Sequence, residues 1–235
     1  MADNMKVIHI SAKWPDPKVI KHAAGIIRRG GLVIFPTETV YGLGADAFNA
    51  QAVRKIFKVK GRPEKKPLIV HVSKKSAIDV LARDVPSAAR KLVRKFWPGP
   101  LTLVLTRRTV KRTVLKGQKG LSFLPDVSDV VTGGGDTVAI RMPDHPVALA
   151  LIRAAGPLAA SSANFSGDPP PRSIKEIPKA LLEKVDLVLD AGRTTVGVPS
   201  TVVDLTKNVP GILRLGAISG GQLKQTGVVI GEEKE

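Results

Sequence analysis

Residues 17–44 read PKVIKHAAGIIRRGGLVIFPTETVYGLG and decide the fold class. The first half places apolar side chains on one helical stripe and stops at Gly30 and Gly31, which predicts a helix over residues 17–29. The apolar run 32–35 has the length and the Val/Ile content of a buried strand. A helix that leads directly into a buried strand favours a layered α/β domain.

The rest of the chain repeats this alternation of short apolar runs with segments of helical period. Further strands are expected at residues 6–10, 68–72, 101–106, 138–141, 158–160, 187–190 and 201–205. Further helices are expected at residues 50–59, 74–82, 86–96, 146–155 and 174–185. The length of 235 residues suits one such domain with short tails.

Two segments lack a clear period. Residues 107–136 carry six Lys and Arg side chains before their first acid, Asp126, and we expect a long basic loop there. From Gly216 onward the chain turns polar and Gly-rich. We therefore divide the chain into a main domain over residues 1–216 and a polar C-terminal tail, or truncated linker, over residues 217–235. Either the basic loop or the tail is a candidate cover for a binding site.

The charge is the unusual part of the composition. Thirty-seven Lys and Arg against 20 Asp and Glu give a net charge of +17, which attracts polyanions such as nucleotides, pyrophosphate and RNA. Solubility alone is the alternative explanation. Cysteine is absent, and no apolar run approaches the roughly 20 residues that cross a bilayer. We expect a cytoplasmic protein that has no membrane partner.

Several familiar sites are excluded by their missing motifs. The sequence contains neither a G-x-x-x-x-G-K-[ST] loop nor a G-x-G-x-x-G turn after a strand, so any nucleotide is held in another way. The four histidines lack metal-ligand spacing, and we predict no metal site built from protein ligands alone. A serine hydrolase is not indicated, because no G-x-S-x-G turn is present.

Short polar clusters follow several expected strands, where α/β domains place their ligands. They lie at residues 35–44, 58–67, 97–102, 139–146 and 160–167. Each cluster alone is equally well explained by turn chemistry or by a solvated surface. Arg141 differs, because an arginine in an apolar strand is rarely buried without a partner. The partner is either a ligand carboxylate or a protein acid, with Asp144 as the nearby competitor.

Taken together and in this order, the clusters resemble the YrdC family of threonylcarbamoyl-AMP synthases. The matching motifs are P-T-E-T-V-Y-G-L-G, K-G-R-P with P-L-I-V-H, W-P-G-P-L-T, R-x-P, S-A-N-x-S-G and S-T-V-V-D, between about residues 6 and 216. The resemblance implies a YrdC-like twisted mixed β-sheet with flanking helices around a basic concave cleft. Two departures are the Leu215 that follows Arg214, where the family has proline, and the length of the 107–136 loop.

The resemblance also implies roles for individual residues. The catalytic positions are Lys60, Arg62, Ser162 and Asn164. The ATP-binding positions are Arg62, Lys66, Thr137, Ser162 and Arg214, and the threonine-binding positions are Thr39, Tyr41, His71, Arg141, Ala160 and Ser200. We expect Lys60 and Arg62 to be loop cations, His71 to be a wall of the site rather than its base, and the Arg141 fork to hold both oxygens of the threonine carboxylate.

The implied activity is L-threonylcarbamoyladenylate synthase, which converts L-threonine, bicarbonate and ATP to threonylcarbamoyl-AMP and pyrophosphate for the modification of tRNA. Mg²⁺ would accompany ATP, and a threonylcarbamoyl-transferase complex would take the product. The alternative is a module that binds double-stranded RNA or tRNA without catalysis, which +17 favours but an aromatic content of only 4% disfavours. A carbamoyl-transfer or hydrolase relative is the third interpretation.

Overall fold

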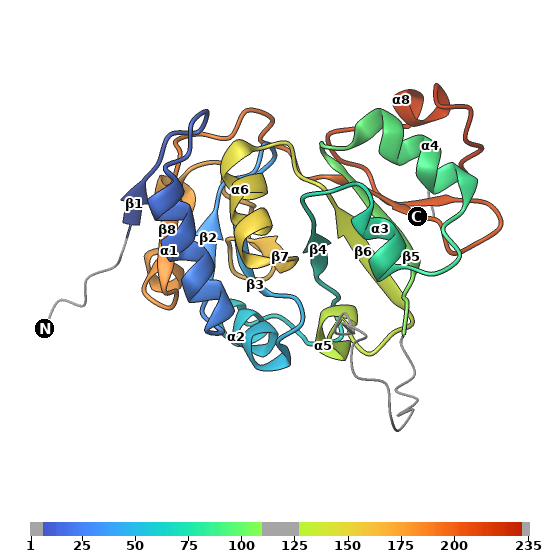
Figure 1. Cartoon of the computed structure of the whole chain (residues 1–235). Coiled ribbons are helices and arrows are strands. Elements are labelled where there is room, and N and C mark those ends of the chain that lie inside the picture. The colour runs from blue at the N-terminus through green and yellow to red at the C-terminus, as the bar shows by residue number, and fades with distance from the viewer. Residues whose placement is uncertain (1–6, 110–126, 232–235) are drawn as a thin grey trace, which may run out of the picture.

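The computed structural model describes residues 7–109 and 127–231. Within these residues, ten strands form a single mixed sheet with helices packed against it (Figure 1). The sheet order is β1-β8-β2-β3-β7-β4-β6-β5-β9-β10. The predicted twisted mixed β-sheet with flanking helices is confirmed.

The bounds of the elements are as follows. The strands are β1 (Val7–His9), β2 (Val33–Phe35), β3 (Gly42–Asp46), β4 (Ile69–His71), β5 (Leu101–Thr106), β6 (Thr137–Arg141), β7 (Leu158–Ser162), β8 (Leu187–Asp190), β9 (Thr201–Asp204) and β10 (Gly211–Arg214). The α-helices are α1 (Pro17–Arg28), α2 (Ala50–Lys60), α3 (Ala77–Leu81), α4 (Ser87–Phe96), α5 (Asp129–Thr132), α6 (Pro146–Ala155), α7 (Lys179–Leu182) and α8 (Gly220–Lys224).

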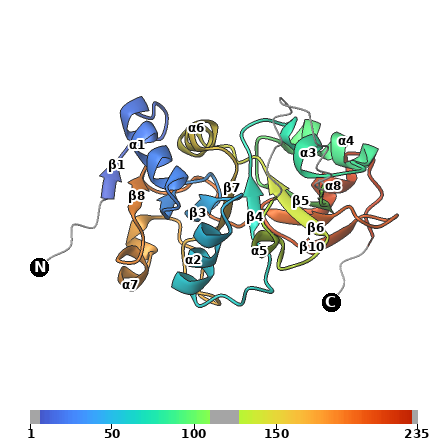
Figure 2. The ribbon, with the colours of Figure 1, turned by 60° about the horizontal axis from the view of Figure 1, so that its bottom comes forward.

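Helix α1 begins and ends where the sequence provides the caps. The Asp16 side chain accepts a hydrogen bond from the Lys18 backbone N–H at 2.7 Å, and Pro17 takes the first helical position. Gly30 follows the helix with a φ of 80°, a conformation that favours glycine. Helix α1 then lies beside α6 on one side of the strands, with α2 on the other side (Figure 2).

Strand β2 is buried on both faces. Val33 and Phe35 belong to the apolar cluster under α1 and α6, whereas Ile34 between them belongs to the larger second cluster. Successive side chains of a strand point to opposite faces, so one short apolar run contributes to two cores. The prediction of a buried strand after the first helix is therefore confirmed.

The remaining strand predictions are confirmed within about two residues, but two strands were missed. Strand β3 reads Gly-Leu-Gly-Ala-Asp, and its glycines mask the strand pattern. They are required by packing, since a Cβ on Gly44 would lie 2.7 Å from Phe35 Cε1 of the neighbouring strand. Strand β10 is short, and its residues are half-buried or exposed.

One helix prediction was wrong in its form. Residues 174–185 do not make one helix, because Pro178 interrupts the segment. A 3-10 turn covers Ile174–Glu176, and the short helix α7 follows the proline. Helix α3 is also shorter than predicted.

The ends of the predicted basic loop are ordered, although residues 110–126 lie outside the described residues. Arg107 pairs with Asp129 at 2.5 Å, and its backbone N–H donates to the Asp136 carbonyl. Helix α5 lies in this segment, where its Val131 carbonyl accepts from the Leu68 N–H. The role of the loop as a cover stays a prediction.

The residues after Gly216 contribute to the core. Ser219 and Gln222 form a capping box at the start of α8, and Leu223 of that helix is fully buried. Ile218 and Val228 join the same apolar cluster. The division at residue 216 stays a prediction, but this packing ties residues 218–228 to the main sheet. No helix in the described part of the chain is long and apolar enough to cross a membrane.

The close contact between Phe35 and Gly44 gives a first prediction. Gly44→Ala should lower the free energy of unfolding by about 1–3 kcal/mol, because the new methyl group overlaps the Phe35 ring in a packed core. Gly211→Ala in β10 is the control, since nothing lies within 4 Å of its added methyl group. Urea denaturation should show a change of no more than about 0.5 kcal/mol for the control. Equal losses in both variants would contradict the packing explanation.

Candidate functional site

A cavity of about 420 Å³ lies against one face of the sheet. Directly opposite residues of neighbouring strands point to the same face, and the register places one set of them in the cavity floor. Ala160 lies opposite Ile69, Ile69 opposite Ala139, and Ala139 opposite Val104, with His71 opposite Arg141 in the next row. All six of these residues line the cavity.

The walls of the cavity come from the connections around this floor. They are contributed by residues 37–40 before β3, residues 62–68 between α2 and β4, residues 164–170 after β7, residues 199–200 before β9, and residues 213–214 of β10. Four of the five polar clusters thus converge on one space. The fifth cluster, residues 97–102, does not line the cavity. It contacts two residues that do, since Gly99 accepts a hydrogen bond from Arg141 and the Thr102 hydroxyl bonds to the Ser200 hydroxyl.

Most of the predicted site residues meet in this cavity. Those that line it are Thr39, Arg62, His71, Arg141, Ala160, Ser162, Asn164, Ser200 and Arg214. Those that do not are Lys60, Lys66, Thr137 and Tyr41.

Lys60 lies beneath the cavity and is not a loop cation. It is the last residue of α2 and is only 2% exposed, so this expectation was wrong. Its Nζ donates to the backbone carbonyls of Ser162 and Asn164 and approaches the Asn164 side-chain oxygen at 3.5 Å. Burial, and then the charge of Arg62, lower the pKa of Lys60 to about 8, while Asp168 acts in the opposite direction. Lys60 therefore fixes the backbone after β7 that presents Ser162 and Asn164.

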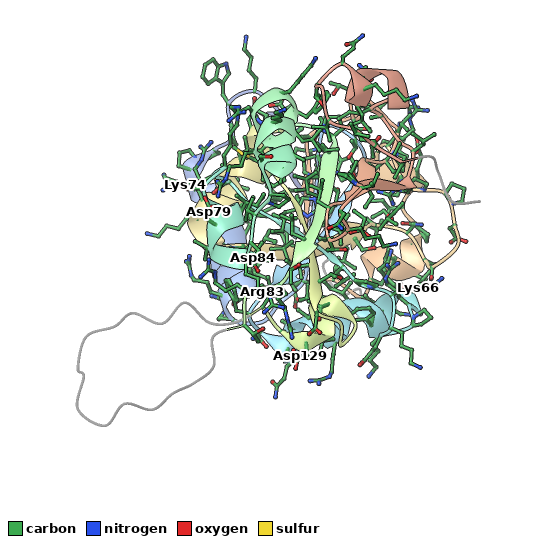
Figure 3. All side chains as sticks on the ribbon, turned by 90° about the vertical axis from the view of Figure 1, so that its right-hand side faces the viewer. Lys66, Lys74, Asp79, Arg83, Asp84 and Asp129 are labelled. Atoms are coloured by element: carbon green, nitrogen blue, oxygen red, sulfur yellow. The ribbon has the colours of Figure 1, made fainter. Side chains whose placement is uncertain are left out.

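Arg62 does lie in the loop after α2. Its Nε and one Nη donate to the carbonyls of Lys66 and Pro67, at 3.2 and 2.9 Å, and burial lowers its pKa. Lys66 itself is exposed and lies at the surface in Figure 3. The loop thus aims Arg62 at the cavity and leaves Lys66 at its outer side.

Thr137 and Tyr41 lie farther away. Thr137 begins β6 opposite Thr106, one strand repeat before Ala139. Tyr41 is fully buried, and its hydroxyl donates to the Gly192 carbonyl at 2.6 Å. Burial is the main cause that raises its pKa, with a smaller contribution from Asp190. In this structure the Tyr41 hydroxyl bonds to residues 190–192 and does not reach the cavity surface.

Arg141 has a protein partner, and it is not Asp144. One Nη donates to Glu38 Oε1 at 2.8 Å and to Thr39 Oγ1 at 2.9 Å, and Nε donates to the Gly99 carbonyl at 3.3 Å. The Arg141 side chain is 5% exposed and the Glu38 side chain 8%, so this is a buried ion pair. Asp144 is exposed. Its carboxyl group still loses part of its hydration, and this loss, followed by the charge of Glu38, raises its pKa.

Arg214 is held by Ser200, which directly precedes β9. Its guanidinium donates to the Ser200 carbonyl at 2.8 Å and to the Ser200 hydroxyl at 3.1 Å. That hydroxyl lies 2.8 Å from the hydroxyl of Thr102, which is fully buried in β5. Burial lowers the pKa of Arg214, and so do the positive charges of Arg141 and then Arg62. The three guanidinium groups therefore repel one another across the cavity.

His71 is the cavity residue whose protonation is most perturbed. Its ring meets the Phe35 ring edge-on at 6.2 Å, and Nδ1 lies 3.3 Å from the Ile69 carbonyl. Burial, and then the charge of Arg141, lower the pKa of His71 to about 3. A neutral imidazole with so low a pKa is a weak base, which agrees with a wall role.

The sequence analysis missed Glu38, Thr102 and Asp168. Glu38 and Thr102 lie inside the quoted motifs, but only the fold brings them to Arg141 and to Ser200. Asp168 is the one carboxylate among the described residues that line the cavity. Against it stand three arginines, one of them paired with Glu38, so the cavity keeps a net positive charge.

Comparison with known proteins decides the family. The family model Sua5_yciO_yrdC, described as telomere recombination, matches residues 25–216. The chain belongs to this Sua5/YciO/YrdC family. Its motifs, sheet and cavity are therefore those of a family member, and the resemblance found in the sequence is confirmed.

Two curated relatives with high identity are named as synthases. The chain is 46% identical to the threonylcarbamoyl-AMP synthase of Pyrococcus abyssi and 44% identical to that of Bacillus subtilis. These matches cover 91% and 89% of this chain, but only 57% and 56% of the two relatives. The chain thus spans little more than half the length of these synthases.

Solved structures agree with the family assignment. The structure of P. abyssi Sua5 complexed with L-threonine aligns with a TM-score of 0.85 at 42% identity, covering 95% of this chain and 62% of that chain. Escherichia coli YciO aligns with a TM-score of 0.73 at 26% identity, covering 93% of this chain and 98% of that chain.

The buried amine of Lys60 gives a second prediction. Lys60→Ala should lower the free energy of unfolding, because the Ser162 and Asn164 carbonyls lose their hydrogen-bond donor. Each acceptor left unpaired away from water costs about 1–3 kcal/mol. Lys58→Ala, on the exposed face of the same helix, should change it by less than about 0.5 kcal/mol. Urea denaturation measures both. If Lys60→Ala unfolds at the same urea concentration as the control, Lys60 does not brace the strand end.

The low pKa of His71 gives a third prediction. Because the folded-state pKa lies near 3 and the usual value is 6.5, unfolding takes up a proton below pH 6.5. Stability should therefore fall as the pH drops from 6.5 toward 3, by up to roughly 1.4 kcal/mol per pH unit.

His71→Leu removes this titration, so its stability should fall less steeply over the same range. Denaturation at several pH values measures the difference between the variant and the parent protein. His22→Leu, which replaces an exposed histidine, is measured alongside as the control substitution. Parallel curves for the parent and His71→Leu would show that His71 is not held neutral.

Proposed function

We propose that the cavity is the reaction site of an L-threonylcarbamoyladenylate synthase, which converts L-threonine, bicarbonate and ATP to threonylcarbamoyl-AMP and pyrophosphate. The observation that carries the proposal is the convergence of nine predicted site residues, three of them arginines, on one cavity. The names of the relatives and the threonine bound to P. abyssi Sua5 support the same assignment.

The threonine carboxylate would bind at Arg141. Since Nε and one Nη already donate to protein acceptors, the remaining Nη makes the contact, and the predicted two-nitrogen grip is not available in this arrangement. Ala160 and the neutral ring of His71 form the adjacent wall. This neighbourhood suits a small amino acid whose apolar part packs against the sheet.

The reaction then needs two bond-forming steps. The threonine amine attacks bicarbonate and water leaves, which gives an N-carboxy intermediate. An oxygen of this carbamate attacks the α-phosphorus of ATP, and pyrophosphate leaves. Arg62 and Arg214 lie where they can offset the charge that develops on the phosphates. Lys60 acts indirectly, by holding the backbone of Ser162 and Asn164.

Magnesium would enter with the nucleotide. No group of three or more His, Asp or Glu side chains in the described residues could hold a metal ion, and Asp168 is the only carboxylate of the cavity lining among them. Mg²⁺ usually keeps several waters and takes one or two carboxylates together with substrate phosphates. The donor set therefore fits Mg²⁺ bound to ATP, with Asp168 as the available protein ligand.

The RNA-binding alternative keeps its support from the net charge of +17. Its discriminating feature is geometric, because three arginines inside a cavity of about 420 Å³ suit a small anionic ligand better than a duplex. Binding to tRNA or double-stranded RNA, delivery to a threonylcarbamoyl-transferase complex and a cytoplasmic location stay predictions.

Pyrophosphate release tests the proposed function. The purified chain, given ATP and Mg²⁺, should release pyrophosphate only when threonine and bicarbonate are both present, because the nucleophile is made from the two. Serine should replace threonine poorly, by a factor of roughly 10 to 200, if the threonine methyl group is packed. Release that is independent of threonine would instead indicate an ATP pyrophosphatase.

A further inference from the structure

The three arginines of the cavity differ in how their charge is balanced. Arg141 pairs with the buried carboxylate of Glu38 at 2.8 Å. Among the described residues, Arg62 and Arg214 make no ion pair, and their guanidinium groups bond only to backbone carbonyls and to the Ser200 hydroxyl. Among the described residues, the cavity thus holds one arginine whose charge is balanced by an ion pair and two arginines that make none.

The Glu38–Arg141 pair also fixes the guanidinium group in space. Three of the five N–H groups of Arg141 are used, two by Glu38 and Thr39 on the same nitrogen and one by Gly99. The other terminal nitrogen has no protein acceptor among the described residues, yet it is not one of their buried, unsatisfied atoms. It is therefore the nitrogen that Arg141 presents to the cavity.

Glu38 is itself held firmly. Its backbone carbonyl accepts hydrogen bonds from the Val196 N–H at 2.8 Å and from the Thr195 hydroxyl at 3.4 Å. The side chain keeps one oxygen, Oε2, buried without a partner, an arrangement that costs free energy and that packing alone does not explain. Asp144 and His145 lie close enough to feel its charge, but neither bonds to it.

We propose that Glu38 is a positioning and specificity-determining residue, which orients Arg141 for a monoanionic carboxylate and disfavours the binding of polyphosphate to Arg141. This inference rests on the proposed function. Neutralising Arg141 leaves directional N–H donors but little net attraction for a highly charged anion. Arg62 and Arg214 then become the preferred partners of the phosphates, so the two substrates are sorted by charge before they react.

The test compares Glu38→Gln with the parent chain. The variant keeps the size of the side chain but removes the charge that balances Arg141. Calorimetry should show threonine affinity lowered at least tenfold, and inorganic pyrophosphate should become competitive with threonine. In the parent chain, pyrophosphate and threonine should occupy the cavity at the same time without competing. The control is Asp79→Asn, which removes a carboxylate from an exposed pair with Arg90 at the same 2.8 Å. Asp79 lies at the surface in Figure 3.

The control should leave both measurements unchanged. A folded Glu38→Gln protein with parent threonine affinity and no pyrophosphate competition overturns the inference. If thermal melting shows that Glu38→Gln is unfolded, Glu38→Asp takes its place. The aspartate keeps the charge on a shorter side chain, so threonine should bind more weakly while pyrophosphate remains non-competitive. Parent threonine affinity in Glu38→Asp would then overturn the positioning role.

Failure of the proposed function would look different. A parent chain that binds no threonine contradicts the assignment of the cavity as a threonine site. Titration with pyrophosphate alone still tests the division of charge, since Glu38→Gln should bind pyrophosphate more tightly than the parent chain does. Equal pyrophosphate affinity in the two proteins would contradict that division.

Discussion

The buried guanidinium of Arg141 is the constraint on which the site depends. A cation placed in the floor of a sheet loses its hydration, and it is tolerated only where the fold supplies acceptors around it. Glu38 and Thr39 arrive from the connection before β3, and Gly99 arrives from the turn before β5. Two segments distant in the sequence are thereby brought to one group.

Lys60 is a second buried cation near the cavity, and the fold accommodates its charge in a different way. It meets no carboxylate within hydrogen-bonding distance among the described residues and instead donates to the chain that follows β7. Because its acceptors are backbone carbonyls, the lysine determines where the strand turns rather than what charge the cavity carries. One buried cation thus shapes the electrostatics of the site, and the other shapes its walls.

The sequence predicted the fold class from its apolar runs, and most of the site residues that its motifs imply through the family resemblance do line the cavity. Strand β3 was missed because Gly42 and Gly44 carry no strand propensity, and their role appears only when Phe35 packs over them. The burial of Lys60 was missed for a related reason. A run of cations from Lys58 to Lys66 looks like a solvated loop until the helix is seen to extend through Lys60.

The partner of Arg141 could not be found by scanning nearby sequence. Glu38 lies 103 residues away, and the strand order that joins the two was not available from periodicity. Asp144 was the natural candidate by proximity along the chain, but it follows the strand on the exposed side. Pairing across a mixed sheet is set by topology, which single-sequence patterns do not encode.

The sheet order has a consequence for how the protein is made. Strand β1 pairs with β8, and the cavity takes its walls from residues as far apart as Thr37 and Arg214. Contacts of such long range cost much loop-closure entropy, which slows folding relative to domains built from local contacts. During synthesis the ribosome must therefore release nearly the whole domain before the cavity can exist. Until β8 has been synthesised, β1 has no strand to pair with. Its unpaired edge is then exposed, and such edges are surfaces that chaperones protect.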